Sequence, residues 1–185
     1  LLIAHRLGLL PDEKVLFLAP TKPLVEQHAT FLNTYLRIED GAITAFTGEV
    51  KPSERDELWK SSRIVVSTPQ VIENDLLAQR IALDDVSTVI FDEAHRATGN
   101  YSYVYIAQRF VEQARHRLVM GMTASPGSNS EKILEVCTNL AIENVEIRSE
   151  ADPDVVPYIH DIEITWIHVE VPLAIKRITQ LLNEV

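Results

Sequence analysis

The chain contains, at residues 89–95, the stretch Val89-Ile90-Phe91-Asp92-Glu93-Ala94-His95, in which an apolar run ends in two adjacent carboxylates. The run begins at residue 86 and is continuous rather than alternating, which is typical of a strand buried on both faces of a parallel sheet. In open sheets of this kind, ligands bind beyond the carboxyl ends of the strands. The stretch therefore predicts a buried strand that delivers Asp92 and Glu93 to a ligand-binding edge.

Further apolar runs alternate along the chain with segments of helical spacing. The other predicted strands are residues 15–19, 43–46, 64–67 and 118–122. The predicted helices are residues 24–32 (with Leu24, Gln27, His28, Phe31 and Leu32 on one face), 54–60, 74–79, 101–114 and 132–140. This alternation predicts the α/β class with a doubly wound, mostly parallel sheet.

Length and composition exclude several classes of protein. A chain of 185 residues, 46% hydrophobic and 24% charged, is of ordinary size and composition for one folded core. The single cysteine excludes a disulfide scaffold and a cysteine-rich zinc site. No stretch approaches 18 uncharged apolar residues, and the first ten residues lack the cleavage site of a signal peptide. We therefore expect no membrane partner and a cytoplasmic protein, nuclear in a eukaryote.

The net charge of −10 taken alone argues against a nucleic-acid partner, because phosphate contacts need lysine and arginine. The charge is, however, unevenly spread. Residues 1–130 hold 16 acidic and 13 basic residues, whereas residues 131–185 hold 11 acidic and 4 basic residues. Because the first part is close to neutral, the acidity of the whole chain does not exclude nucleic acid there.

Polar turns follow three other predicted strands. These turns are Pro20-Thr21-Lys22, Ser67-Thr68-Pro69 and Thr123-Ala124-Ser125. Parallel strands bring all of them to the edge that carries Asp92, where hydroxyls and free backbone N–H groups are good phosphate ligands. The sequence therefore predicts a phosphate-binding edge.

The adjacent carboxylates have a use in nucleotide hydrolysis. Asp92 can hold Mg²⁺ through water, because this ion prefers few carboxylates and keeps much of its hydration. Glu93 can orient and deprotonate the attacking water. The alternative is that one of the two simply caps the following helix, where acidic residues are favoured.

In this order the motifs resemble motifs Ia, Ib, II and III of superfamily 2 DEAH-box helicases, closest to the branch of archaeal Hef, FANCM and Mph1. The resemblance implies a RecA-like ATP-binding domain over residues 1–150. Residues 151–185 would then be a linker and the start of a following domain, such as a helical insert. It also implies ATP and Mg²⁺ as cofactors, with ATP bound between this domain and a second RecA-like domain of the same chain.

The resemblance further implies roles for single residues. Asp92 would hold Mg²⁺ through water, Glu93 would be the catalytic base, and His95 would couple ATP hydrolysis to its partners Thr123 and Ser125. The residues implied to contact the nucleic-acid backbone are Pro20, Thr21, Lys22, Thr47, Gly48, Thr68 and Pro69. The implied activity is that of an ATP-dependent helicase or translocase acting on branched or forked DNA in repair, with DNA favoured over RNA.

The chain departs from the family pattern because it has no Gly-Lys-Thr or Gly-Lys-Ser phosphate loop. We expect these 185 residues to hydrolyse ATP negligibly by themselves, as part of a larger enzyme. Two alternatives stay open at this point. One is an RNA or double-stranded-RNA helicase of the RIG-I or Dicer type, and the other is a RecA-like module that binds without hydrolysis.

The remaining patterns are less specific. Residues 145–147 and the alternating stretch 158–171 predict further strands, and residues 173–185 predict a helix. The tyrosines Tyr101, Tyr103 and Tyr105 could stack on bases, but Tyr101 and Tyr105 share one helix face, and packing is the favoured interpretation.

Overall fold

The computed structural model of the chain describes residues 1–39, 41–125, 127, 129–149, 151–158, 165–169 and 172–183, without the side chains of Gln180 and Asn183. The chain divides into two compact units, Leu1–Val145 and Glu146–Val185. Within the described residues, no helix is both long enough and apolar enough to cross a membrane.

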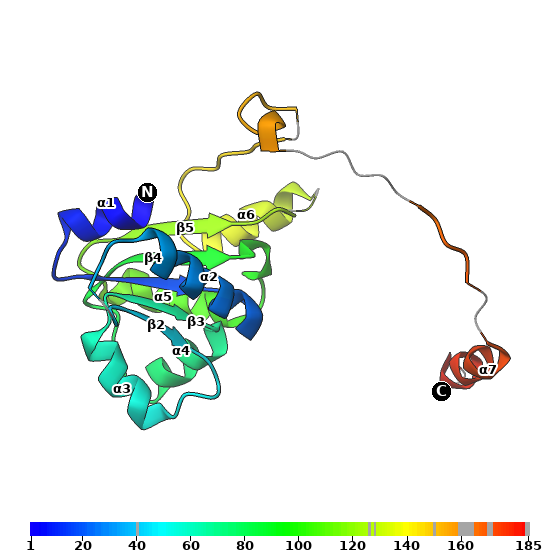
Figure 1. The fold of residues 1–185 in the computed structure, drawn as a ribbon, viewed down its shortest axis with the longest axis horizontal. Coiled ribbons are helices and arrows are strands. Elements are labelled where there is room, and N and C mark those ends of the chain that lie inside the picture. The colour runs from blue at the N-terminus through cyan, green and yellow to red at the C-terminus, as the bar shows by residue number, and fades with distance from the viewer. Residues whose placement is uncertain are drawn as a thin grey trace. The chain divides into compact units, whose positions relative to one another are not determined.

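The first unit is built on a five-stranded parallel sheet (Figure 1). Its strands lie in the order β2 (Ile43–Phe46), β3 (Ile64–Ser67), β1 (Lys14–Leu18), β4 (Val86–Asp92) and β5 (Leu118–Met122). Every pair of neighbours is parallel, so the carboxyl ends of all five strands share one edge. The predicted α/β class and the five predicted strands are confirmed, with ends shifted by one residue at most.

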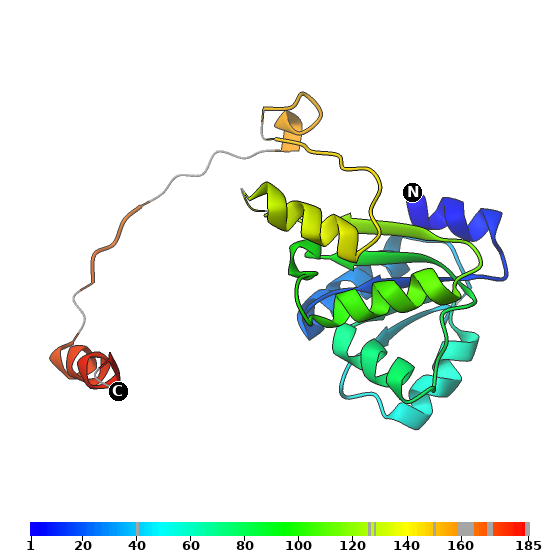
Figure 2. The ribbon, with the colours of Figure 1, turned by 180° about the vertical axis from the view of Figure 1, so that it is seen from behind.

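Helices cover both faces of the sheet, as Figures 1 and 2 show from opposite sides. The face covered by α1 (Leu2–Leu9) and α2 (Lys22–Tyr35) packs against Val15 and Phe17 of β1. The opposite face, covered by α3 (Pro52–Ser61), α4 (Pro69–Leu77) and α5 (Ser102–Gln113), packs against Leu16 and Leu18. Since β1 is buried on both faces, its sequence is apolar at every step from Val15 to Leu18 rather than at alternate steps.

Two details of the helices differ from the sequence prediction. Helices α3 and α4 start at Pro52 and Pro69, earlier than expected, because proline at the first helical position fixes φ without losing a needed N–H. In α2, the buried face is Val25, Ala29 and Leu32, whereas Phe31 is exposed and packs against the Tyr35 ring. Of the predicted face, Leu32 is buried and Leu24 and His28 are partly buried, whereas Gln27 and Phe31 are exposed, so the predicted face was rotated from the real one.

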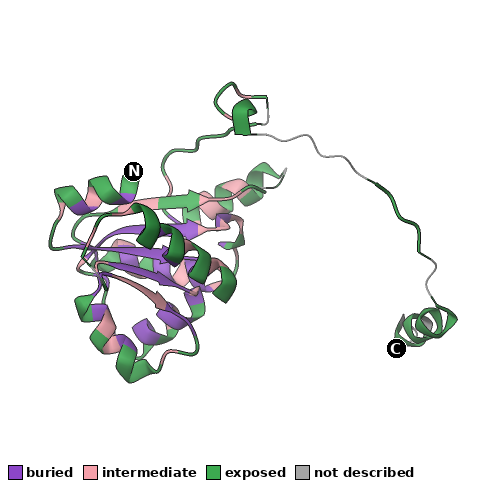
Figure 3. Ribbon diagram, in the orientation of Figure 1, coloured by how far each residue is buried: buried purple, intermediate pink, exposed green. Residues whose placement is uncertain are grey.

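The strand β5 lies at an end of the sheet and is more exposed than β1, β3 and β4, which Figure 3 shows as largely buried. Its Gly121 is needed for close packing. A Cβ at this position would lie 2.9 Å from Ile142 Cδ1 and 3.1 Å from the Cβ of Ala94. The glycine thus lets the end of β5 approach the turn that follows β4, and this approach brings the two strand ends together.

Helix α6 (Ser130–Asn139) follows β5, and its N-cap Asn129 accepts a hydrogen bond from the Glu131 N–H. The predicted strand at residues 145–147 is wrong, because these residues carry no strand pairing. In the second unit, a short 3₁₀ turn (Val156–Tyr158) and α7 (Leu173–Asn183) are formed. Of the predicted strand 158–171, residues 165–169 are not in a strand, while 159–164, 170 and 171 lie outside the described residues.

Candidate functional site

The site begins where β4 ends, at Asp92. The next residue, Glu93, has φ 51° and ψ 48°, a left-handed conformation that costs a non-glycine residue on the order of 1 kcal/mol. Its side chain makes no capping hydrogen bond to the short 3₁₀ turn Ala94–Arg96 that follows. The alternative that Glu93 is a helix cap therefore has no support, and its carboxylate is left available for chemistry.

A second group of polar residues joins the ends of β4 and β5. The Nδ1 atom of His95 lies 2.8 Å from the Thr123 hydroxyl and 3.3 Å from a carboxylate oxygen of Glu93. The Ser125 N–H donates to the same Thr123 hydroxyl at 3.1 Å. The structure thus brings together Asp92, Glu93, His95, Thr123 and Ser125, as the sequence led us to expect.

The Asp92 carboxylate is held from a helix far away in sequence. The ring Nε2 of His28, on α2, lies 2.9 Å from Asp92 Oδ2, and both side chains are partly buried. Sequence reasoning placed His28 on an inward helix face but gave it no partner. The missed signal was a histidine among the core-facing positions of a helix, which needs a polar partner when it is partly covered.

The main chain at Asp92 is fixed by Tyr103 of α5. The Tyr103 hydroxyl lies 2.7 Å from the Asp92 carbonyl oxygen and 3.2 Å from the carbonyl oxygen of Leu18, so it reaches the ends of both β4 and β1. Burial raises the pKa of this phenol well above its usual value, which keeps it a hydrogen-bond donor. Tyr103 is fully buried, and neither its burial nor its hydroxyl contacts were anticipated, because the sequence placed only Tyr101 and Tyr105 on a packing face.

The residues expected to contact phosphates lie along the same edge. Thr21 is the exposed N-cap of α2, directly after Pro20. Lys22 donates to Glu49 at 2.6 Å and lies 3.6 Å from a Glu26 oxygen. The hydrogen bond that Lys22 donates to Glu49 is the main reason that the pKa of Lys22 is raised. The cation is thus exposed but already paired with carboxylates.

The remaining expected contacts follow β2 and β3. Gly48 is exposed, whereas Thr47 is 7% exposed and its hydroxyl accepts the Glu49 N–H at 3.4 Å. The Thr68 N–H donates to the carbonyl of Phe46, and Pro69 is buried at the start of α4. Thr47 and Pro69 therefore have little side-chain surface to offer a ligand, and their contribution would come through the backbone and the shape of the turn.

A buried ion network, which sequence reasoning missed, supports the turn after β2 that carries Thr47 and Gly48. The Arg55 guanidinium donates to Asp75 at 2.6 and 2.8 Å and also to the Val50 carbonyl, two residues beyond Gly48. Arg80 donates to the same Asp75 at 2.7 Å. Burial by itself would raise the pKa of Asp75, but the hydrogen bonds from the two arginines outweigh it and hold the pKa below the usual value of 3.8.

The donor set around Asp92 fits a divalent cation bound with a nucleotide. Within the described residues, no three His, Cys, Asp or Glu side chains are grouped so that they could hold a metal by themselves. The side-chain hydrogen bond found for Asp92 reaches Oδ2, so Oδ1 is left for an ion or its water. A single carboxylate that reaches the ion through water, with phosphate oxygens also present, suits Mg²⁺, because this ion takes few carboxylates and keeps much of its hydration.

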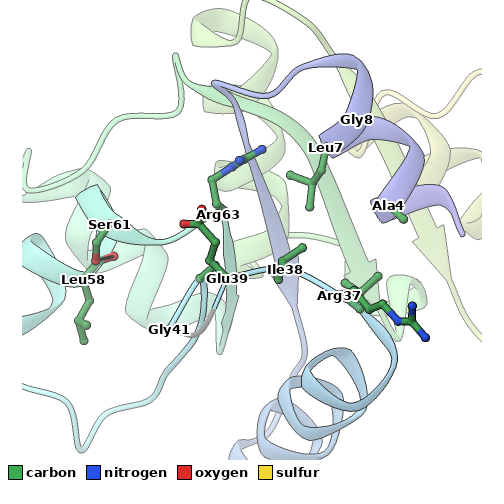
Figure 4. Close-up of a pocket in the computed structure, with 12 residues that line it drawn as sticks. Ala4, Leu7, Gly8, Arg37, Ile38, Glu39, Gly41, Leu58, Ser61 and Arg63 are labelled. Atoms are coloured by element: carbon green, nitrogen blue, oxygen red, sulfur yellow. Dashed lines mark hydrogen bonds between the residues drawn. The ribbon is translucent and has the colours of Figure 1, made fainter.

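A hollow of about 750 Å³ lies at the opposite edge of the sheet (Figure 4). It is lined by α1, by the segment after α2, by the end of α3 and by Arg63, which directly precedes β3. None of the residues expected to act in catalysis or nucleic-acid binding lines it. The hollow and the polar cluster at the carboxyl edge are therefore separate.

Known proteins with similar sequences and structures identify the family of this chain. Residues 1–133 match the family model described as "DEAD/DEAH box helicase", and the chain belongs to this family. The crystal structure of the Pyrococcus furiosus Hef helicase domain superposes with a TM-score of 0.81 and 51% identity, covering 97% of this chain and 38% of that one. The resemblance to the Hef, FANCM and Mph1 branch is thereby confirmed, as is the RecA-like helicase fold.

The curated relatives are much longer proteins. A Methanocaldococcus jannaschii protein named "Putative ATP-dependent RNA helicase" is 46% identical over 173 residues, which are 94% of this chain and 22% of the relative. The Fanconi anemia group M protein homolog of Mus musculus is 38% identical over 151 residues, 82% of this chain and 8% of the relative. The ATP-dependent DNA helicase mph1 of Sclerotinia sclerotiorum is 39% identical over 176 residues, 94% and 14% respectively. The chain spans less than a quarter of the length of each of these relatives.

Proposed function

We propose that this chain is part of the motor of an ATP-dependent DNA helicase or translocase that acts on branched or forked DNA. The observation that carries the proposal is the polar cluster at the carboxyl edge, where His95 contacts both Thr123 and Glu93, directly after Asp92. The Asp92 carboxylate is held there by His28. The name of the mph1 relative, an ATP-dependent DNA helicase, favours DNA as the polymer.

In this proposal each residue has a distinct task. Mg²⁺ bound with ATP supplies positive charge that neutralises the phosphates. Asp92 would hold the ion through water, while Glu93 would accept a proton from the water that attacks the terminal phosphate. His95, which reaches both Glu93 and Thr123, relays the state of the hydrolysis site to the turn after β5. A second RecA-like domain of the same protein closes the other side of the nucleotide.

Nucleic acid is proposed to lie along the turns that carry Thr21, Lys22, Gly48 and Thr68. These turns offer hydroxyls, backbone N–H groups and one lysine, which bind phosphates without reading bases. Such contacts suit a motor that must move along any sequence. Because the 185 residues contain no Gly-Lys-Thr or Gly-Lys-Ser, we expect them to hydrolyse ATP negligibly when expressed alone.

An RNA helicase is the second candidate, because the 46% identical archaeal relative carries that name. Phosphate contacts do not separate the two polymers, since the 2′-hydroxyl is the chemical difference. The test is ATP hydrolysis by the protein expressed from its complete gene, with forked DNA, linear duplex DNA, single-stranded RNA and duplex RNA as stimulators. We expect forked DNA to stimulate most. Stronger stimulation by either RNA would favour the second candidate, and no hydrolysis with any polymer would favour a binding module.

A further inference from the structure

The contact between His28 and Asp92 connects two elements that are 64 residues apart in sequence. An ionised carboxylate only accepts hydrogen bonds, so the ring nitrogen Nε2 of His28 must carry the hydrogen and donate it to Oδ2. The side chains are 25% and 18% exposed, respectively. A charge-assisted hydrogen bond that is largely shielded from water is stronger than one on the surface, and it fixes the direction of the carboxylate.

The histidine ring is itself held in place from two sides. The aromatic ring of Phe17, in β1, lies 4.5 Å from the His28 ring, centroid to centroid, at a tilt of 38°. On the helix, His28 is flanked by the buried residues Val25 and Ala29, which anchor α2 to the sheet. The position of Nε2 therefore follows the position of α2 with little freedom of its own.

Asp92 accepts hydrogen bonds at two separate atoms. His28 binds side-chain Oδ2, and the Tyr103 hydroxyl binds the main-chain carbonyl oxygen at 2.7 Å. With both points fixed, Oδ1 has a defined direction. A carboxylate that is oriented in this way needs no rearrangement when it receives an ion, which is how outer partners of metal ligands raise affinity.

The same helix begins at the proposed nucleic-acid edge. Thr21 is the N-cap of α2 and Lys22 is its first residue, six positions before His28. At 1.5 Å per residue, the two ends of this segment are separated by about 9 Å along a rigid helix. A small shift of the helix start on binding a phosphate is therefore passed to Nε2 of His28, and through it to Asp92.

We propose that His28 is a positioning residue that orients Asp92 for the divalent cation and couples it, through α2, to nucleic acid bound at Thr21 and Lys22. The coupling part of this inference rests on the proposed function, whereas the orientation of Asp92 does not depend on which polymer is bound. The two parts are therefore measured separately.

The test compares three variants of the protein expressed from its complete gene. His28→Leu removes the donor and keeps side-chain volume, and His28→Gln keeps an amide N–H that can reach Asp92. His5→Leu is the matched control, because His5 is exposed on α1 and has no contact with Asp92. Binding of Mn²⁺, used in place of Mg²⁺, is measured in the presence of ADP by electron paramagnetic resonance, which needs no turnover.

We expect His28→Leu to weaken Mn²⁺ binding by about tenfold, the usual effect of losing an outer partner of a metal ligand. His28→Gln is expected to restore most of this affinity, and His5→Leu to match the unsubstituted protein. Equal Mn²⁺ affinity in His28→Leu and the unsubstituted protein would overturn the inference. So would a His28→Gln variant as weak as His28→Leu, since lost packing rather than a lost donor would then be the cause.

Coupling is read from the ratio of ATPase rates with and without forked DNA. We expect His28→Leu to lower this ratio at saturating Mg²⁺, with the affinity for DNA itself unchanged. An unchanged ratio would overturn the coupling but leave the orientation of Asp92 standing. If the unsubstituted protein shows no ATPase stimulated by nucleic acid, the proposed function fails, while the Mn²⁺ measurement still decides the role of His28.

Discussion

The networks around Asp75 and Asp92 both bring a carboxylate below the surface, but they satisfy it in opposite ways. Asp75 has no exposed surface, and three hydrogen bonds from Arg55 and Arg80 engage both of its oxygens. Asp92 is partly exposed and has one side-chain partner, His28, on one oxygen. A carboxylate that stabilises the fold can therefore be distinguished from one with an oxygen left for a ligand by the number of its oxygens that already accept hydrogen bonds. Burial alone does not distinguish the two.

The largest effect should come from Glu93→Gln, which removes the proposed base beside Asp92 and keeps the size of the side chain. We expect kcat for ATP to fall by about 10²- to 10⁴-fold, the usual contribution of a positioned general base. Hydrogen exchange of the peptides around β4 should be unchanged, because the carboxylate makes no capping bond. Hydrolysis at the normal rate would show that Glu93 is not the base.

The Asp75→Ala substitution, by contrast, should lower the stability of the fold and should not act on ATP hydrolysis directly. Removal of this carboxylate leaves Arg55 charged, buried and unpaired, and we expect α3 and α4 to lose about 3 to 5 kcal/mol of protection in hydrogen exchange. The control is Asp56→Ala, which breaks the exposed pair with Lys60 and should cost less than about 1 kcal/mol. Equal losses of protection in Asp75→Ala and Asp56→Ala would show that the buried Asp75 network does not stabilise the fold more than an exposed pair does.

The Asp75 network should also respond to pH. Because the pKa of Asp75 is lowered in the folded protein, its carboxylate stabilises the fold above the ordinary aspartate pKa of about 3.9. This contribution is lost as the pH falls through the lower, folded-state pKa. The difference in stability between the unsubstituted protein and Asp75→Asn should therefore stay constant from pH 7 to about pH 4 and shrink below that. A difference that shrinks already near pH 6 would contradict the assignment.

Tyr103→Phe should have an intermediate effect, because this residue supports the functional carboxylate from within the core. Loss of its hydroxyl leaves the carbonyls of Leu18 and Asp92 without this donor, at an expected cost of about 1 to 2 kcal/mol in local protection. Tyr105→Phe is the matched control, since the Tyr105 hydroxyl contacts only the partly exposed Arg109 among the described residues. If both variants behave alike, Tyr103 contributes packing only.

The smallest effect is expected from Glu49→Gln at the exposed pair with Lys22. This change removes the main partner of the lysine and frees it for phosphate, and DNA should bind up to about fivefold more tightly at low salt, because an exposed pair holds the lysine only weakly. The gain should fade at high salt because surface charges are screened. Glu57→Gln removes the same charge from an exposed site on α3. It should reproduce only the part of the gain in DNA affinity that comes from lowering the negative charge of the protein.

The positions of the strands were predictable because the sheet is buried on both faces. Continuous apolar runs mark β1, β3 and β4, and even the less covered β5 was placed correctly. The polar turns could also be placed, since parallel strands bring their carboxyl ends to one edge. The predicted strand at residues 145–147 was wrong because a short apolar run without a pairing partner gains nothing from an extended conformation.

The partners of the site residues were not predictable. The contacts of His28 with Asp92 and of Tyr103 with Leu18 join residues 64 and 85 positions apart, and no local periodicity encodes them. The Arg55–Asp75 network was missed for the same reason, since its members lie on two different helices. Helix orientation about its own axis decides such contacts, and for α2 the predicted face was rotated from the real one.

The left-handed backbone at Glu93 has a consequence for how this sequence tolerates change. Glycine would adopt the same φ and ψ with no steric cost, so a Glu93→Gly change removes a local penalty on the order of 1 kcal/mol while it removes the carboxylate. Selection for thermal stability alone would thus favour loss of this residue, and under the proposed function selection for turnover would oppose it. Any stability-guided redesign of the domain should therefore hold position 93 fixed, because it is a place where improving the fold and keeping the activity pull in opposite directions.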